Sequence, residues 1–120
     1  MKWIIDKNRP ICPQICEQLC MAIASKRLLS REKVYSVREL ALKLGVNPNT
    51  VQKSYDILEE KGIIFSVRGS GWFVSEDTTI AKEVVKGVVE SKVLGFFKEM
   101  EQLGFDEEMV MKYLKERKGE

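Results

Sequence analysis

The spacing of apolar residues predicts two short helices in the middle of the chain. Between Ser36 and Gly45 apolar residues recur every three or four positions, which is the period of one helix face: Val37, Leu40, Ala41 and Leu44. Ser36 and Glu39 have the spacing of a capping box, and Gly45 suits the left-handed position that ends a helix. Asn47 then predicts the N-cap of a second helix, with Pro48 at its first position.

The second predicted helix has an apolar face and a polar face. Val51, Tyr55 and Leu58 are expected to point inward. The residues expected to point outward near its start carry hydrogen-bonding groups and no acid: Asn49, Thr50, Gln52 and Lys53. Such side chains suit a recognition helix, because base edges in the major groove and the flanking phosphates present hydrogen-bonding groups and negative charge.

A β-hairpin is predicted after Gly62. Residues Ile63 to Val67 and Trp72 to Val74 are strand-like, and Arg68–Gly71 forms a tip with little side-chain bulk. A thin loop with one arginine can lie against a phosphate backbone or enter a minor groove. Each feature alone is most often a solvated surface or an ordinary turn. Their order, two capped helices and a basic hairpin, favours a winged helix-turn-helix.

The N-terminal region predicts a short strand and a helix with three cysteines. Trp3–Ile5 is strand-like, and Pro13 is expected to open a helix whose apolar face holds Ile15, Leu19, Ala22 and Ile23. The cysteines follow at intervals of four, with Cys12 predicted among the core positions and Cys16 and Cys20 towards the edge of that face.

The three cysteines allow two interpretations. Cysteine commonly packs as a small apolar residue, and we favour this role. The alternative is a thiol-responsive or metal-responsive regulator that uses Cys12, Cys16 and Cys20. The chain has no histidine and no CxxC pair, so a four-ligand zinc site would need carboxylates or a second subunit. We therefore predict no metal and no cofactor.

After an acidic boundary at residues 76–79, a long helix up to Leu103 and a shorter helix capped by Asp106 are predicted. The long helix carries an apolar seam at spacings of three and four, typical of a coiled-coil contact: Val85, Val89, Val93, Phe96, Phe97, Met100 and Leu103. A short helical hairpin cannot bury this seam internally. We expect it to form a homodimer, the alternative being that it folds back onto the helix-turn-helix.

Composition and charge agree with this division. Residues 1–75 carry twelve Lys and Arg against seven Asp and Glu, whereas the remainder carries eight against eleven. The basic excess therefore accompanies the predicted DNA-reading part. We expect a winged helix-turn-helix domain at 1–75 and a helical dimerisation region at 76–120. The chain shows no transmembrane stretch, so we expect a cytoplasmic protein. It also shows no set of catalytic residues or catalytic motif, so we expect that it is not an enzyme.

These motifs resemble a known family. The runs PICPQICEQLCMAIASKRLL and SVRELALKLGVNPNTVQKSYDILEEKGIIFSVRGSGWFV resemble the DNA-binding domain of GntR-family bacterial transcription regulators, and VNPNTVQ with RGSGWFV is most similar to the YtrA-like subfamily. The fold class implied is mainly α, a winged helix-turn-helix with a small β-hairpin wing and a C-terminal helical dimerisation hairpin. The family usually has a glycine and a proline before the serine cap, whereas this chain has LLSREKVYS, with Tyr35 at the proline position.

The resemblance implies a sequence-specific regulator, expected to be a repressor, that binds double-stranded DNA at a palindromic operator as a homodimer. Arg38 is expected to contact a phosphate or a guanine. The implied DNA-binding set is completed by Ser36, Asn47, Asn49, Thr50, Gln52, Lys53, Arg68 and Gly69. Many family members read guanine with arginines at the positions that Pro48 and Gln52 occupy in this chain. Those contacts do not transfer, so the base preference stays open. The resemblance also leaves open whether a small-molecule effector exists. The rival function is a winged-helix module that binds protein.

Overall fold

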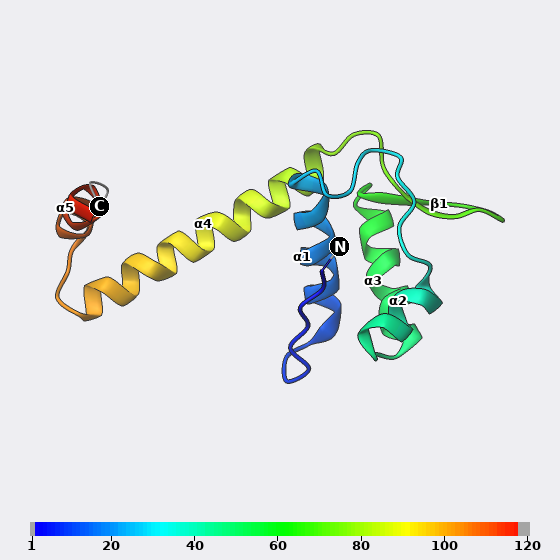
Figure 1. Cartoon of the computed structure of the whole chain (residues 1–120), viewed down its shortest axis with the longest axis horizontal. Coiled ribbons are helices and arrows are strands. Elements are labelled where there is room, and N and C mark those ends of the chain that lie inside the picture. The colour runs from blue at the N-terminus through cyan, green and yellow to red at the C-terminus, as the bar shows by residue number, and fades with distance from the viewer. Residues whose placement is uncertain (1, 118–120) are drawn as a thin grey trace. The chain divides into compact units, whose positions relative to one another are not determined.

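The computed structural model describes residues 2–117. It contains α1 (Ile11–Ala24), α2 (Val37–Leu44), α3 (Pro48–Glu60), β1 (Ile64–Val67), β2 (Gly71–Val74), α4 (Thr79–Gln102) and α5 (Glu107–Arg117). The predicted mainly helical fold with one β-hairpin is confirmed (Figure 1). None of the helices described is long and apolar enough to cross a membrane.

Two compact units make up the chain, Met1–Val85 and Lys86–Glu120, and each is described by itself. The first unit therefore includes the start of α4, where Ala81 is buried in the core and Val85 packs against it. The sequence-based domain limits at 1–75 and 76–120 stay a prediction, since those limits describe function as well as packing.

The core of the first unit lies where α1, α2 and α3 meet the inner face of the hairpin (Figure 1). Every helix contributes residues that are at most 3% exposed. These include Ile15, Leu19 and Ile23 of α1, Leu40 and Ala41 of α2, Val51, Tyr55 and Leu58 of α3, and Ile64 and Val74 of the hairpin. The inward face predicted for α3 is therefore confirmed.

The hairpin pairs β1 and β2 antiparallel, with Ile64 opposite Val74 and Ser66 opposite Trp72. Because side chains alternate between the two faces of a strand, these four point to the core side, while Phe65 and Phe73 stack on the other face. Gly71 belongs to β2 rather than to the tip. A third segment joins the hairpin through a bridge between Lys33 and Phe73.

The strand predicted at Trp3–Ile5 is wrong: this segment has no regular secondary structure and pairs with no strand. Two glutamine side chains of α1 take the place of a neighbouring strand. The Ile4 N–H donates to Gln18 Oε1 over 2.9 Å, and the Asp6 N–H donates to Gln14 Oε1 over 2.8 Å. The amide nitrogen of Gln14 returns a 2.9 Å bond to the Asp6 carbonyl. The segment is thus fixed to α1 without a sheet.

The start of α1 and the order of burial of its cysteines also differ from the prediction. The helix begins at Ile11, two residues before Pro13. Cys20 is buried in the core and Cys12 is half-buried, the opposite of the prediction for these two residues, whereas Cys16 is half-buried, in agreement with its predicted place at the edge. A helical wheel ignores position along the axis: Cys12 lies in the first turn, while Cys20 lies in the part of α1 that packs on the core.

The second unit is built from the remainder of α4 and from α5. Gly104 has a φ of 86°, which turns the chain after α4, and the Met109 N–H donates to Asp106 Oδ1 over 2.9 Å. Asp106 is therefore the N-cap of α5, as predicted. An apolar groove is lined by Phe96, Met100, Leu103, Phe105, Val110, Tyr113 and Leu114.

Candidate nucleic-acid interface

The first candidate residues lie at the start of α2, which is fixed by a complete capping box. Ser36 Oγ accepts the Glu39 N–H over 3.1 Å, and Glu39 Oε1 accepts the Ser36 N–H over 3.0 Å. These bonds from Ser36 hold the pKa of the Glu39 carboxyl below its usual value. Arg38 is exposed in the first turn and points away from the core. The cap thus presents Arg38 at a defined position.

The turn between α2 and α3 is fixed by two residues. Gly45 has a φ of 65°, a left-handed conformation that a residue with a Cβ adopts at a cost. Asn47 Oδ1 accepts the Asn49 N–H over 2.8 Å and caps α3. This oxygen of Asn47 is therefore occupied, and the amide nitrogen is the group of Asn47 that is left for a ligand.

The start of α3 presents a polar surface. Asn49, Gln52 and Lys53 are exposed and Thr50 is half-buried. The Gln52 amide nitrogen donates to Asp56 Oδ1, one turn further on, over 2.9 Å. Asp56 was not considered in the sequence analysis, although the i, i+4 spacing indicates such a pair. One N–H of the Gln52 amide is thus occupied, which leaves its second N–H and its carbonyl oxygen for a base.

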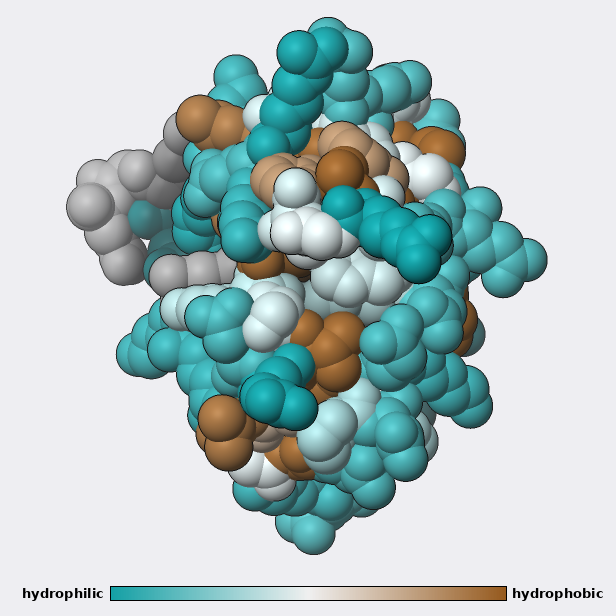
Figure 2. Space-filling model, turned by 90° about the vertical axis from the view of Figure 1, so that its right-hand side faces the viewer, coloured by the Kyte–Doolittle hydropathy of each residue, from teal (hydrophilic) through white to brown (hydrophobic). Residues whose placement is uncertain are grey.

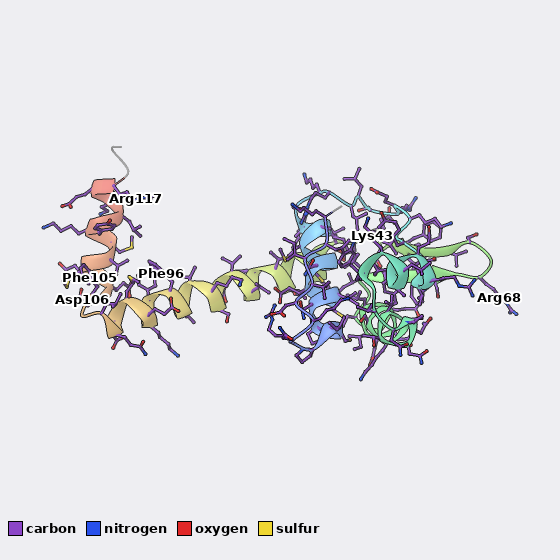
Figure 3. All side chains as sticks on the ribbon, turned by 60° about the horizontal axis from the view of Figure 1, so that its bottom comes forward. Lys43, Arg68, Phe96, Phe105, Asp106 and Arg117 are labelled. Atoms are coloured by element: carbon purple, nitrogen blue, oxygen red, sulfur yellow. The ribbon has the colours of Figure 1, made fainter. Side chains whose placement is uncertain are left out.

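The hairpin tip places Arg68 at the outer end of the wing (Figure 3). Gly69 follows with a φ of 83°, and both residues are exposed. Glu59 of α3 anchors the base of the wing, because its Oε2 accepts both the N–H and the hydroxyl of Ser66 over 2.9 Å each. Sequence analysis missed this contact, which fixes the wing relative to α3.

A further connection joins the wing, α3 and the loop before α2. The Val34 N–H donates to the Trp72 carbonyl over 2.9 Å, and the Tyr55 hydroxyl donates to the Tyr35 carbonyl over 2.7 Å. The Tyr55 and Trp72 rings meet edge to face, 5.3 Å between centroids. Burial raises the pKa of Tyr55, and the nearby Glu39 carboxylate adds to this rise. The Tyr55 hydroxyl therefore stays a donor.

Sequence analysis also missed a cation beside the turn. Lys7 Nζ donates to the Gly45 carbonyl over 3.2 Å, although the two residues lie 38 positions apart. An ammonium has three N–H donors, so two are left for an anion. Seen from the side where the hairpin projects, the surface is largely hydrophilic (Figure 2). The elements described above carry four exposed cations: Lys7 beside the turn, Arg38 at the start of α2, Lys53 in α3 and Arg68 at the hairpin tip.

The predicted dimerisation residues occupy different environments within their units. Val89 and Val93 are exposed on α4, at 53% and 46%. Phe96 and Phe97 meet edge to face with 5.5 Å between their centroids. Phe96, Met100 and Leu103 line the apolar groove of the second unit. Val85 differs, because it packs against the core of the first unit.

The cysteine cluster has the properties of packing residues. Burial, followed by the neighbouring Cys12 thiol, raises the pKa of Cys16 to about 12, and burial raises that of Cys20 to about 11. The thiolate is the form that binds metals and reacts with oxidants. In residues 2–117 no three Cys, Asp or Glu side chains gather as a metal site would require. The raised pKa values keep the Cys16 and Cys20 thiols protonated at neutral pH, which favours a packing role over a sensing role.

The raised thiol pKa values predict that stability falls in alkali. The folded chain binds the thiol protons of Cys16 and Cys20 more tightly than the unfolded chain does. This contribution is complete below the ordinary pKa of 9.0 and is lost as the pH rises towards about 11. Urea unfolding across this range should show the decline, and it should be weaker in Cys20→Ala. If the free energy of unfolding fell equally with pH in Cys20→Ala and in the parent chain, the contribution assigned to Cys20 would be contradicted.

Comparison with known proteins agrees with this geometry. The family model described as "Bacterial regulatory proteins, gntR family" matches residues 13–74. An uncharacterised HTH-type transcriptional regulator, YhcF of Bacillus subtilis, is 36% identical over 110 residues, which cover 92% of this chain and 91% of YhcF. The HTH-type transcriptional repressor YtrA of the same organism is 35% identical over 99 residues, covering 82% and 72%.

Solved structures show the same architecture. A GntR family transcriptional regulator from Listeria monocytogenes has a TM-score of 0.79 at 35% identity, covering 93% of this chain and 98% of that one. The AraR DNA-binding domain in complex with operator ORX1 has a TM-score of 0.53 at 25% identity, covering 62% and 92%. The chain belongs to the GntR family of bacterial regulatory proteins and is a DNA-binding transcription regulator, not an enzyme.

Proposed function

We propose that this regulator is a repressor that binds a palindromic operator as a homodimer. The observation that carries the proposal is the exposed polar start of α3, with Lys7 at the preceding turn and Arg68 at the wing tip. Asn49, Thr50 and Gln52 would read base edges in the major groove, and Lys53 would bind a phosphate. Ser36, Arg38 and Asn47 would contact the phosphate backbone of the DNA beside the turn between α2 and α3.

The wing would add a contact outside the major groove. Arg68 and Gly69 at its tip have little bulk around them, so the arginine can approach a phosphate or the minor groove. The relative YtrA is described as a repressor, and the AraR domain was solved on operator DNA. The first supports repression as the sign of regulation, and the second supports operator DNA as the ligand that we propose here. Such an operator lies in the cytoplasm of a bacterium.

The homodimer is supported by the apolar surface of the second unit. Its large apolar side chains are exposed to an extent that is unusual for a free surface, from 39% at Phe96 to 70% at Leu103. We propose that Val89, Val93, Phe96, Phe97, Met100 and Leu103 form the contact, with Val85 at its inner end. Two copies related by a two-fold axis would place two recognition helices on two half-sites.

Selection of bound sites from random duplexes tests this function. We expect an inverted repeat whose half-sites lie one helical turn, or a multiple of it, apart. A single asymmetric site would contradict the two-fold arrangement, and recovery of no site would favour the protein-binding alternative. Val93→Glu should yield a monomer in sedimentation experiments and weaken binding to the repeat. Lys98→Glu, a charge change elsewhere on α4, is the matched control and should do neither.

A further inference from the structure

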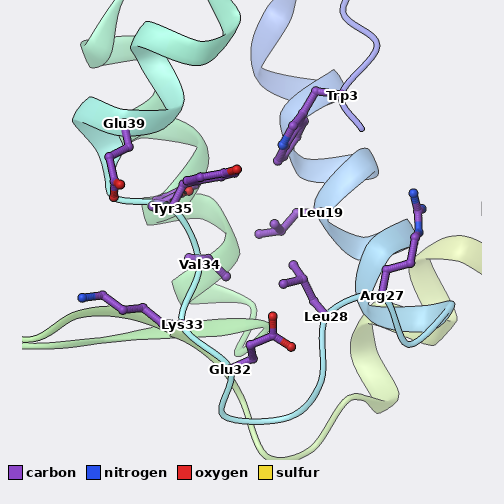
Figure 4. A pocket seen from close by; sticks show the side chains of 10 residues that line it. Trp3, Leu19, Arg27, Leu28, Glu32, Lys33, Val34, Tyr35 and Glu39 are labelled. Carbon is purple, nitrogen blue, oxygen red and sulfur yellow. Dashed lines mark hydrogen bonds between the residues drawn. The ribbon is translucent and has the colours of Figure 1, made fainter. Parts of the chain in front are cut away.

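A cleft in the first unit is unused by the proposed DNA contacts (Figure 4). It has a volume of about 370 Å³, within the range of small-molecule sites, roughly 300–1,000 Å³. Trp3 and Tyr35 extend towards it from different elements, and Leu19 and Leu28 lie below Trp3 in this view. Glu32 and Arg27 bring one charge of each sign to its lining. Lys33 and Glu39 add a second charge of each sign, but Glu39 closes the capping box of α2 and the Lys33 side chain points away from Leu19 and Leu28.

The polar groups of the cleft have capacity for a ligand. The indole N–H of Trp3 is buried and has no acceptor among the residues described, which costs free energy unless an acceptor arrives. Glu32 uses one carboxylate oxygen to accept the Leu29 N–H over 3.0 Å, so its second oxygen is available. Arg27 uses Nε to bond Ser25 Oγ over 2.9 Å, which leaves its terminal N–H groups.

We propose that this cleft is an effector site for a small zwitterion, an α-amino acid with an apolar side chain. The ligand's side chain packs on Leu19, Leu28 and the Trp3 and Tyr35 rings. Its carboxylate accepts from the Trp3 N–H and from Arg27, and its ammonium group pairs with Glu32. The assignment uses the unpartnered Trp3 donor together with Arg27 and Glu32, whereas a purely cationic or anionic ligand would leave Arg27 or Glu32 unmatched.

The lining of this cleft also holds the DNA-reading elements in place. Val34 bonds the wing at Trp72, and the Tyr35 carbonyl accepts the hydroxyl of Tyr55 from α3. Glu39, a further lining residue, closes the capping box of α2. A ligand that shifts the loop carrying Val34 and Tyr35 therefore changes the relation between α3 and the wing. Occupancy is expected to change operator affinity, and by linkage operator changes ligand affinity by the same factor.

Calorimetric titration of the full chain with L-phenylalanine and L-leucine tests the binding step without DNA, so its outcome is independent of the proposed operator. We expect a dissociation constant below about 1 mM for at least one of them. Phenethylamine lacks the carboxylate and 3-phenylpropionate lacks the amine, and each should bind at least about tenfold more weakly than L-phenylalanine. The proposal would be overturned if neither amino acid bound. It would also be overturned if both analogues bound as tightly as L-phenylalanine.

Three variants locate the site, and one serves as a control. Trp3→Phe keeps the aromatic wall but removes the N–H, Glu32→Gln removes the carboxylate, and Arg27→Gln removes the guanidinium. Each should weaken amino-acid binding about tenfold or more. Glu60→Gln, an exposed acid at the end of α3, should bind as the parent chain does. Full affinity in Trp3→Phe and Glu32→Gln would place the ligand elsewhere and end the proposal for this cleft.

Discussion

Replacing Tyr55 with alanine is expected to lower the free energy of unfolding of the first unit by about 3–5 kcal/mol. Tyr55 is fully buried, and its ring packs edge to face on Trp72. Its hydroxyl also closes the 2.7 Å bond to the Tyr35 carbonyl. The alanine variant therefore loses a core side chain and leaves the Tyr35 carbonyl without its donor. Because small domains are stable by only about 5–15 kcal/mol, this loss removes a large fraction of the stability of the first unit.

Tyr55→Phe separates the two contributions. Phenylalanine keeps the ring and removes only the hydroxyl, so we expect a loss of about 1 kcal/mol, the usual net value of one hydrogen bond. Both tryptophans of the chain, Trp3 and Trp72, belong to the first unit, so their fluorescence in urea follows this unit alone. Equal losses in the two variants would show that the hydroxyl, not ring packing, dominates at this position.

Features that depend on neighbours within one turn were predictable from the sequence. The capping box at Ser36, the N-cap at Asn47 and the cap at Asp106 each need only two residues a few positions apart. Such bonds form whenever the local backbone is helical, so the residue pattern is sufficient. The same holds for the inward face of α3, because helical periodicity alone fixes which side chains share a face.

Contacts between distant segments were not predictable in this way. The Lys7 bond to Gly45, the Glu59 bonds to Ser66 and the pairing of Lys33 with Phe73 join residues whose types are common on any surface. Arg31 has a φ of 67°, in the loop where relatives usually carry a glycine. Here a left-handed conformation is adopted by a residue for which it is unfavourable, and neither composition nor periodicity indicates this.

Loss of the Lys53 ammonium is expected to weaken binding to every DNA sequence by a similar factor. Lys53 is exposed on α3 next to the residues proposed to read bases, so its proposed partner is a phosphate. A phosphate contact releases condensed counterions, and Lys53→Ala should therefore reduce the slope of log affinity against log salt by about 0.9. Lys61→Ala is the matched control, since Lys61 caps the opposite end of the same helix. Its affinity and salt slope should equal those of the parent chain.

Asn49→Ala should instead act on sequence preference. We expect a loss of about 1–3 kcal/mol on the selected operator, little change on unrelated DNA and an unchanged salt slope, because an amide reads a base without displacing counterions. Gln52→Ala should cost less than Asn49→Ala, since one N–H of the Gln52 amide is already bonded to Asp56 Oδ1 over 2.9 Å, which leaves fewer of its groups for a base. Binding measurements on operators altered one base pair at a time distinguish these cases. Equal losses on specific and random DNA for Asn49→Ala and Lys53→Ala would show that α3 does not read bases in the proposed orientation.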